Sequence, residues 1–206
     1  MRRNILVIGA GPAGLSLARA LAHSPHRVTL VERQPLETLA SPPPDGREIA
    51  LTQRSRAILT AMGVWPRLPR DEIFPLEQAR VRNGGSAFAL SIAPDRGDAL
   101  GTLVSNHHIR EALFDAVAQQ GNVQWITGKG VASAHADERG AHVVLDDGTE
   151  LRGALLVAAD SRFSGVRDQL GIGASVERLE RTMLVARFAH SRPHHGVATE
   201  WFAYGR

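Results

Sequence analysis

An α/β fold with a parallel sheet is the fold class that the sequence predicts, and three observations support it. The apolar run NILVI leads into a glycine-rich turn and then into a helical stretch from about 12 to 22. The stretch RVTLVER follows as a second strand, which completes a β-α-β unit of about 30 residues. Residues 76–103 and the segment after 171 have the pattern of short strands instead, which predicts a β-rich region interrupting the α/β domain.

The later elements follow from their periodicity and their turn residues. Residues 34–48 are rich in proline and lack periodicity, which predicts a loop. Residues 53–62 have helical spacing up to Gly63, and residues 106–120 have it between Asn106, a predicted N-cap, and Gly121. Strands are predicted at ARVRN and FALSI around an NGG turn, at LGTLVS, VQWIT, GVASAHAD and AHVVL, at ELRGALLVAAD after a DDGT turn, and at SVERLERTMLVARFAH and ATEWFAYGR; a short helix is predicted at SGVRDQLGI.

Composition excludes several classes of protein and site. The chain has 206 residues, 43% of them hydrophobic and 22% charged, which is typical of a globular protein with a sizeable core. The longest apolar runs are about five residues, against the ~20 that a membrane helix needs. The N-terminus lacks the pattern of a signal peptide, so we expect a cytoplasmic location. Cysteine is absent, which excludes disulfides, thiolate metal sites and a cysteine nucleophile.

The positive charge does not indicate a nucleic-acid partner. The formal net charge is +3, Lys129 is the only lysine, and the arginines are scattered instead of forming a basic stripe. His107-His108 and His194-His195 are adjacent pairs without a carboxylate at ligand spacing, so we expect no metal site.

The glycine-rich turn predicts a dinucleotide site. Gly9 is expected to make the tight turn, Gly11 to let a pyrophosphate approach the backbone, and Gly14 to let the helix pack on the strand. Glu32 closes the second strand 18 residues after Gly14, where a carboxylate binds a ribose diol. Strand, glycines, helix, strand and acid in this order favour a ligand site over an empty turn. The pattern does not choose between NAD and FAD; Arg33 hints at a 2′-phosphate, but such an arginine usually replaces the acid.

The chain resembles a known family along essentially its whole length. The stretches GAGPAGLSLARAL, VER, DGREIALTQRSRAILTAMGVW and LLVAADSRFSGVRDQLGI together are similar to the flavoprotein aromatic hydroxylases of the p-hydroxybenzoate hydroxylase fold, and most similar to the ubiquinone-biosynthesis hydroxylases. The resemblance implies a Rossmann-like FAD-binding domain at 1–75 and 104–170 and part of a β-rich substrate domain at 76–103 and 171–206. It also implies an FAD-dependent monooxygenase that uses NAD(P)H and O2 to hydroxylate a phenolic or quinol precursor of ubiquinone.

The same resemblance implies a set of FAD-binding residues and names no catalytic side chain. Asp160 matches an aspartate that hydrogen-bonds the ribityl chain, Arg47 an arginine beside the flavin ring, and Arg110 a position near the flavin phosphates. An N-cap role for Asp160 and solvent-exposed roles for Arg47 and Arg110 are the alternatives. The full predicted set is Gly9, Ala10, Gly11, Pro12, Ala13, Gly14, Glu32, Arg33, Arg47, Arg110, Val131 and Asp160.

Two departures from the family pattern carry expectations of their own. Ser161 stands where the family has glycine, so we expect a strained turn if that position needs a positive φ. GDAL at 97–100 is similar to the family's third FAD motif, but it lies too early in the chain. We therefore expect the true motif beyond residue 206, a parent protein longer than this chain, and little hydroxylase activity in the 206 residues alone.

Other functions stay open at this point. One is a truncated or non-catalytic flavin-binding subunit of a biosynthetic complex. A different flavoenzyme, such as an amine oxidase, is disfavoured by DGREIAL and AADSRFSGVR. Peripheral membrane association and homo-oligomer formation also stay open.

Overall fold

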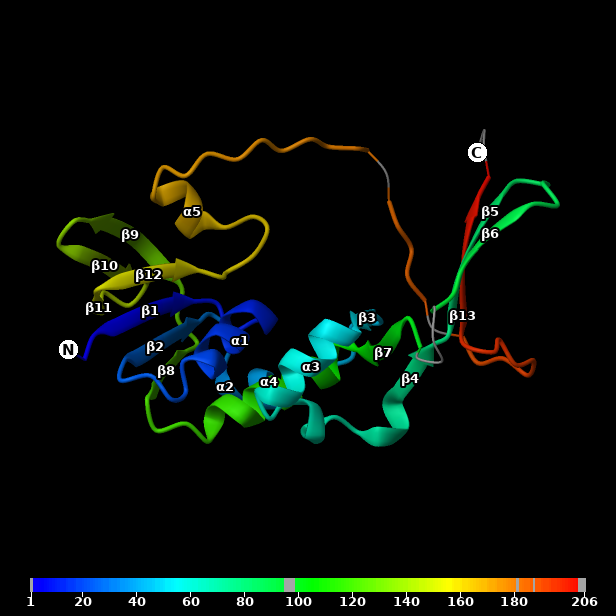
Figure 1. Cartoon of the computed structure of the whole chain (residues 1–206). Helices are drawn as coiled ribbons and strands as arrows, with labels where there is room; N and C mark the ends of the chain where they lie inside the picture. Colours follow the sequence, from blue (N-terminus) through cyan, green and yellow to red (C-terminus); the bar gives the residue numbers. More distant parts are fainter. Residues whose placement is uncertain (1, 95–98, 181, 187, 204–206) are drawn as a thin grey trace. The chain divides into compact units, whose positions relative to one another are not determined.

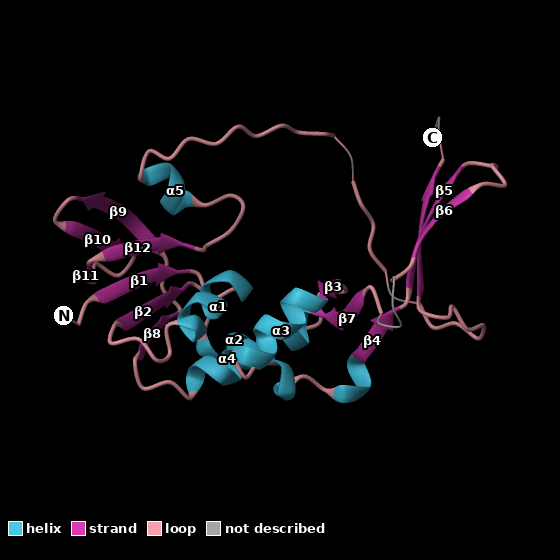
Figure 2. Cartoon of the chain, in the orientation of Figure 1, coloured by secondary structure: helices cyan, strands magenta, loops and turns pink. Residues whose placement is uncertain are grey.

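The structure, a computed structural model, describes residues 2–94, 99–180, 182–186 and 188–203. The chain divides into two compact units. Unit 1 comprises residues 1–43 and 109–182, and unit 2 comprises residues 44–108 and 183–206. Both units contain helices and strands (Figure 2). The limits of these units differ from those of the predicted FAD-binding and substrate domains, and that division into domains stays a prediction.

A four-stranded parallel sheet is the centre of unit 1 (Figure 1). Its strand order is β12-β1-β2-β8, and every neighbouring pair is parallel. An antiparallel sheet of β9, β10 and β11 lies over one face, and helices lie on the other. The elements of this unit are β1 (Asn4–Ile8), α1 (Pro12–Ala20), β2 (Arg27–Glu32), α2 (Leu36–Ala40), α4 (Asn106–Ala118, which begins in unit 2), β8 (Val123–Thr127), β9 (Val131–Asp137), β10 (Gly140–Leu145), β11 (Glu150–Gly153), β12 (Leu155–Ala158) and α5 (Gly165–Gln169).

Alternation along β1 and β2 builds the two halves of the core. Leu6, Ile8 and Val31 point toward the antiparallel sheet and form one cluster with its Val143 and Leu145. The side chains between them on the same strands point to the other face. Further buried apolar residues there are Val7, Val28 and Leu30 of the sheet and Leu15, Ala18, Leu113 and Val117 of α1 and α4. The predicted β-α-β unit and α/β class are confirmed.

Unit 2 is built from two small sheets. One has the order β3-β7-β4, with both pairs antiparallel. In the other, β5 and β6 form a hairpin around the predicted NGG turn, and β13 pairs with β5 in parallel. The elements are β3 (Glu48–Thr52), α3 (Gln53–Ala61), two 3-10 turns (Trp65–Arg67 and Arg70–Glu72), β4 (Ile73–Leu76), β5 (Gln78–Asn83), β6 (Ala89–Ile92), β7 (Gly101–Ser105) and β13 (Val197–Phe202).

Three sequence predictions about elements are wrong. The segment predicted as strand from Ser175 to His190 contains no strand in its described residues, because nothing there pairs with it and its apolar side chains stay exposed. The strand predicted at ELRGALLVAAD is two strands, β11 and β12, which belong to different sheets, and β12 lies at a sheet edge where Leu155 is 53% exposed. The predicted loop at 34–48 contains the short helix α2 and the first residue of β3.

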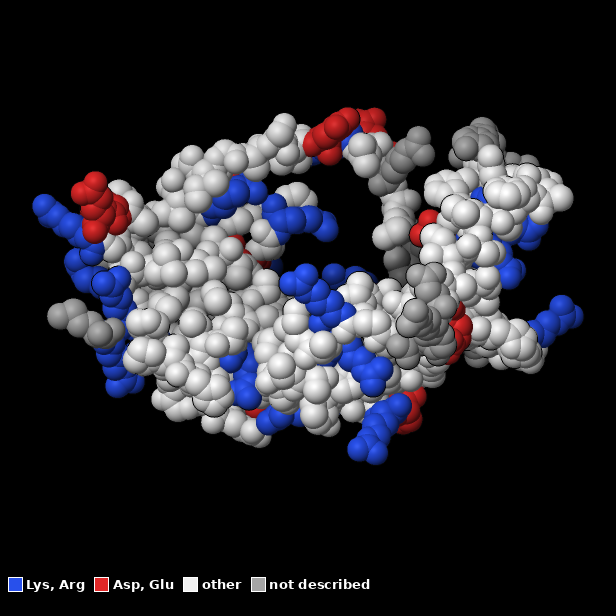
Figure 3. All heavy atoms as spheres, viewed as in Figure 1, with Lys and Arg blue, Asp and Glu red and all other residues white. Residues whose placement is uncertain are grey.

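No helix among the described residues is long and apolar enough to cross a membrane. Figure 3 shows basic side chains on the visible face of both units, with a group of them along the left edge of the view.

Candidate functional site: a dinucleotide pocket in unit 1

The turn between β1 and α1 requires two of its three glycines for the fold itself. Gly9 has φ +104°, and its amide donates to the Val31 carbonyl at 2.8 Å. A Cβ at Gly9 would lie 2.3 Å from the Ala159 carbonyl oxygen, and a Cβ at Gly14 would lie 1.9 Å from the Gly9 carbonyl oxygen. Both positions therefore exclude a side chain by direct contact with backbone.

Gly11 differs, because the position that a side chain would occupy there is open among the described residues. A Cβ there would meet nothing within 4 Å, and φ is an ordinary −73°. Gly11 is the N-cap of α1, no side chain caps this end, and Pro12 begins the helix. Among the described residues, no side chain therefore caps the first amides of α1, as a phosphate at a helix N-terminus requires.

Glu32 is held at the end of β2 by two backbone amides. Ala10 N–H donates to Oε2 at 2.8 Å, and Gln34 N–H donates to Oε1 at 3.0 Å. Both bonds fix the carboxylate beside the glycine turn, and each oxygen keeps a further lone pair for a ligand hydroxyl. Glu32 is half-buried, and the neighbouring Arg33 is exposed.

Asp160 carries a buried oxygen without a partner. Its Oδ2 accepts a long hydrogen bond of 3.4 Å from Val166 N–H, while Oδ1 is buried and has no hydrogen-bond partner among the described residues. Leaving a buried carboxylate oxygen unpaired is costly, so a donor from outside the chain is expected there. The next helix, α5, has Ser164 as its N-cap, whose Oγ accepts from Arg167 N–H at 2.9 Å. This arrangement favours the ligand role of Asp160 over the N-cap alternative.

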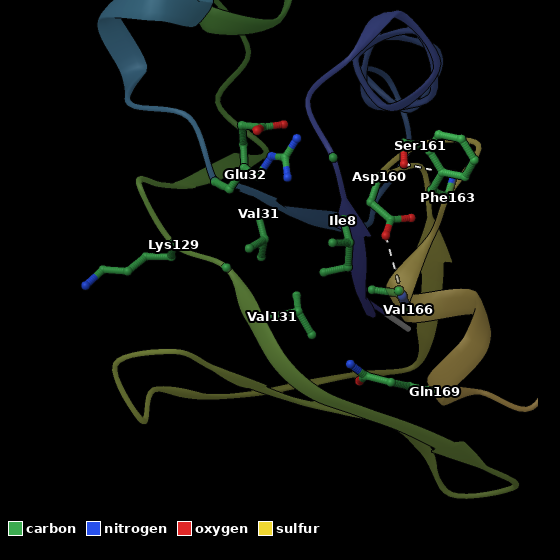
Figure 4. Close-up of a pocket in the computed structure, with 14 residues that line it drawn as sticks. Ile8, Val31, Glu32, Lys129, Val131, Asp160, Ser161, Phe163, Val166 and Gln169 are labelled. Atoms are coloured by element: carbon green, nitrogen blue, oxygen red, sulfur yellow. Dashed lines mark hydrogen bonds between the residues drawn. The ribbon is translucent and has the colours of Figure 1, made fainter.

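These groups meet in one pocket of about 290 Å³, shown in Figure 4. Apolar side chains of Ile8, Val31 and Val131 lie between Glu32 on one side and Asp160 on the other. The volume is at the low end for ligand pockets, so it suits a part of a dinucleotide. Of the predicted residues, the pocket lining contains Gly9, Glu32, Arg33, Val131 and Asp160.

The remaining predicted residues lie outside the lining. Ala10, Gly11, Pro12, Ala13 and Gly14 continue the glycine turn that starts in the pocket at Gly9.

The two arginines that the resemblance assigns to the flavin, Arg47 and Arg110, also lie outside the pocket lining. Arg110 is on α4, with Nη2 3.5 Å from Gln34 Oε1. Arg47 belongs to unit 2, where it pairs with Asp45 at 2.5 Å. The assignment of either arginine to a flavin stays a prediction.

The Asp45 carboxyl organises the loop that contains Arg47. Arg47 Nε and Nη2 donate to Oδ2 of Asp45, and so does Asn106 Nδ2, at 2.7 Å. Partial burial would raise the pKa of Asp45, but the hydrogen bonds from Arg47 and Asn106 outweigh it and lower that pKa from 3.8 to about 2. The Arg47 carbonyl in turn accepts from Asn106 N–H at 2.9 Å.

Sequence reasoning missed the loop between β8 and β9, which forms a wall of the pocket. Lys129 and Gly130 line it, and Lys129 N–H donates to the Glu32 carbonyl at 3.2 Å. Asp146 Oδ2 accepts from Gly130 N–H at 2.9 Å, and Asp147 pairs with the Lys129 ammonium at 2.7 Å, which raises the pKa of Lys129. The GKG stretch directly after a strand was the signal that could have predicted this wall.

Four residues in and just before α5 were also missed. Phe163, Gly165, Val166 and Gln169 line the pocket, and Phe163 is 69% exposed. They follow Asp160 within nine residues, so the aspartate motif itself was the signal for them.

The expected strain at Ser161 is wrong. Among the described residues the non-glycine positions with positive φ are Glu180 and His195, and Ser161 is not one of them. Its Oγ accepts from Phe163 N–H at 3.1 Å, which closes a local turn that serine supports without a left-handed backbone.

Two further predictions concern metal ligands and the GDAL stretch. Within the described residues no three His, Asp or Glu side chains gather as metal ligands would. The GDAL stretch at 97–100 lies partly outside the described residues, since these omit 95–98.

Comparison with known proteins agrees with this geometry. A family model described as "FAD binding domain" matches residues 2–202. Ubiquinone hydroxylase UbiM of Neisseria meningitidis serogroup C is 45% identical over 212 residues, which cover 100% of this chain and 46% of that protein. Ubiquinone hydroxylase UbiL of Rhodospirillum rubrum is 30% identical, covering 97% of this chain and 46% of that protein. The chain thus spans about half the length of these curated relatives.

Solved structures show the same fold. PqsL of Pseudomonas aeruginosa, described as a probable FAD-dependent monooxygenase, matches with a TM-score of 0.70 and 21% identity over 86% of this chain and 48% of that chain. The 2-methyl-3-hydroxypyridine-5-carboxylic acid oxygenase matches with a TM-score of 0.66 and 23% identity over 82% of this chain and 42% of that chain. At these identities the likeness concerns the fold alone. The match of the family model to residues 2–202, together with the glycine turn, Glu32 and Asp160 in one pocket, shows that this chain belongs to the FAD binding domain family.

Proposed function

We propose that this chain is the FAD-binding part of a monooxygenase that hydroxylates an aromatic ring of a ubiquinone precursor. The observation that carries the proposal is the unpaired Oδ1 of Asp160 in the same pocket as Gly9 and Glu32. Support for the substrate class comes from the 45% identity to a ubiquinone hydroxylase along the whole chain.

The residues present fit FAD, and each would hold a different part of it. The unfilled space at Gly11 and the free first amides of α1 suit the pyrophosphate. The Glu32 carboxylate, already oriented by Ala10 and Gln34, suits a ribose diol. Asp160 Oδ1 suits a hydroxyl donor, which the ribityl chain supplies.

Bound FAD would supply the redox chemistry, by taking electrons from NAD(P)H and activating O2. The chain's own part is to orient the cofactor and keep it in place. Arg47, if it reaches the flavin ring as the resemblance implies, would stabilise negative charge there, and Asp45 fixes its guanidinium. The small aromatic substrate, the NAD(P)H co-substrate, assembly with other chains and a cytoplasmic location stay part of the proposal.

Equilibrium FAD binding by the purified chain tests the proposal. We expect quenching of flavin fluorescence on titration, and a loss of affinity of about tenfold or more in Asp160→Asn, since a charge-assisted hydrogen bond contributes about 1.5–3 kcal/mol. Asp168→Asn, which changes an exposed aspartate of α5 outside the pocket lining, is the matched control. Absence of FAD binding, or equal affinity in all three proteins, would contradict the assignment.

The hydroxylation step needs a separate assay. The protein, in the longest form that its gene encodes, is incubated with NAD(P)H, O2 and a 2-alkylphenol, and the product is analysed by mass spectrometry. We expect a product heavier by one oxygen atom. FAD binding with no oxygenated product from any phenolic precursor would support the non-catalytic flavin-binding subunit instead.

A further inference from the structure

A second pocket lies in unit 2, and its lining combines apolar walls with histidines. Its volume is about 620 Å³. Phe74 and Leu103, on neighbouring strands β4 and β7, supply one wall, and Phe188 supplies another. Phe74 is 43% exposed and Phe188 81% exposed, so these walls present apolar surface that a ligand ring would cover.

The hydrogen bonds of the two histidines determine which ring nitrogen carries a proton. His190 Nδ1 lies 2.7 Å from the Arg192 carbonyl oxygen. A carbonyl only accepts, so Nδ1 is the protonated nitrogen, and the neutral ring keeps its lone pair on Nε2. His194 is the opposite: its Nδ1 accepts from Gly196 N–H at 3.1 Å, so its neutral ring carries the proton on Nε2.

The two neighbouring rings therefore differ in the group that their free nitrogen offers. Their centroids are 5.0 Å apart in an edge-to-face arrangement, and both line the pocket. Nε2 of His190 accepts and Nε2–H of His194 donates. A hydroxyl group is both donor and acceptor, so this pair matches a hydroxyl on an aromatic ring that rests against the apolar walls.

Charge selects among hydroxylated rings. Glu48 is the charged residue in the pocket lining, and its Oε1 accepts from the buried Ser105 Oγ at 2.7 Å. Among the described residues, the lining contains neither arginine nor lysine. A carboxylate-bearing ring would meet the like charge of Glu48, which is unfavourable.

We propose that this pocket receives an uncharged phenol or quinol ring, with His190 Nε2 as the acceptor and His194 Nε2–H as the donor for its hydroxyl. This inference rests on the proposed function and deepens it, because it names residues that would contact the aromatic substrate. If the hydroxyl ionises, the O–H electron pair stays on oxygen and the proton moves to Nε2 of His190, whose Nδ1–H remains on the Arg192 carbonyl.

Probe binding to the 206-residue chain tests the proposal without FAD. The probes are 2-propylphenol, its methyl ether, which cannot donate, and 4-hydroxybenzoate, which is anionic. We expect calorimetric affinity about three- to tenfold higher for the phenol than for either other probe, the range that one hydrogen bond provides. In His190→Phe the affinity for the phenol should fall to the affinity for the methyl ether. His135→Phe, an exposed histidine of unit 1, is the matched control and should behave as the unchanged protein.

Two-bond ¹H–¹⁵N NMR of the imidazoles gives a readout that a loss of packing would not imitate. At a pH where both rings are neutral, His190 should show the Nδ1–H form and His194 the Nε2–H form, and phenol should shift Nε2 of His190. Equal affinity for phenol and methyl ether, no binding of either, or the opposite tautomer of His190 would overturn the proposal. Because these outcomes concern unit 2 alone, they are distinguishable from a failure of FAD to bind unit 1.

Discussion

Gly11 and Gly14 lie three residues apart, and the fold itself needs only the second to be glycine. A Cβ at Gly14 would meet the Gly9 carbonyl oxygen at 1.9 Å, whereas a Cβ at Gly11 would meet nothing within 4 Å. The sequence motif assigned one role to each glycine, and the structure separates a packing role from the free approach that a ligand needs.

Alanine substitution separates these roles by experiment. Gly14→Ala should lower the free energy of unfolding by about 3 kcal/mol or more, because backbone must move. Gly11→Ala should cost about 1 kcal/mol or less, as a poorer N-cap, yet weaken FAD binding roughly tenfold or more by obstructing the pyrophosphate. Urea unfolding without FAD and flavin titration measure the two quantities. Unchanged FAD affinity in Gly11→Ala would refute the role given to that glycine.

Asp45 makes a pH-dependent contribution to stability with a defined sign. Its pKa in the folded chain is about 2, below the ordinary 3.8, so the folded state favours the ionised form. The contribution is therefore full above the ordinary pKa and is lost as pH falls from about 4 to about 2. At pH 7, Asp45→Asn should lower the free energy of unfolding by about 1–2 kcal/mol, a range that allows for solvent screening of a side chain that is 24% exposed. Near pH 2 the same substitution should change the free energy of unfolding little.

Thermal unfolding of both proteins across pH 2–7 measures this effect. Asp71→Asn, which changes an exposed aspartate of the same unit, is the control. A stability difference for Asp45→Asn that stays constant down to pH 2 would contradict the assigned pKa.

At the scale of elements, periodicity predicted those that bury one face and failed for those that do not. The helices α1, α3 and α4 begin at the predicted residues and end within two residues of the predicted ends. The segment 175–190 has an apolar composition typical of a strand, but Met183 and Leu184 are 84% and 92% exposed and find no partner strand. The apolar pattern of a segment indicates which side chains it could bury, whereas its pairing as a strand depends on residues distant in the sequence.

The β10–β11 turn has a testable function at this scale, since it secures a pocket wall. Asp146 Oδ2 accepts from Gly130 N–H at 2.9 Å, and Asp146 N–H donates back to the Gly130 carbonyl at 3.0 Å. Asp146→Ala removes the side-chain bond, so the loop that lines the pocket becomes less ordered. We expect FAD affinity to fall about three- to tenfold, with stability lowered by about 1 kcal/mol.

Asp137→Ala provides the matched control for this turn. Asp137 Oδ1 accepts from Arg139 N–H at 2.8 Å in the β9–β10 turn, so the same kind of bond is removed from a turn outside the pocket lining. Flavin titration should show no loss for this variant. Equal losses in both variants would attribute the effect to general destabilisation.

For the whole molecule, the sequence predicted the parts of the site that short motifs encode and missed the part that only the tertiary fold assembles. Gly9, Glu32 and Asp160 were predicted from three separated motifs, and the parallel order β12-β1-β2 brings their strand ends together. Lys129 and Phe163 join them only because β8 neighbours β2 and α5 returns over the sheet. The histidine pocket of unit 2 had no linear signal, since its residues come from β3, β4, β7 and the segment before β13.

Exposed apolar surface should make the 206-residue chain self-associate. The exposed large apolar residues between Gly171 and the second pocket include Val176, Leu179, Met183 and Leu184, from 65% to 92% exposed. A net charge of +3 gives only weak repulsion between copies. Sedimentation velocity from about 5 to 100 µM should therefore show association that increases with concentration. Burial of apolar surface drives it, with a gain in free energy of about 25 cal/mol per Å².

A matched pair of double variants locates the cause. Met183→Glu with Leu184→Glu removes two exposed apolar side chains and should restore the monomer. Ser175→Glu with Thr182→Glu adds the same charge to the same segment without removing apolar surface, so it should still associate. Monomeric behaviour of the unchanged chain at 100 µM would contradict the predicted association. Equal dissociation in both double variants would show that charge or another surface controls it, because only the first pair changes the exposed apolar area.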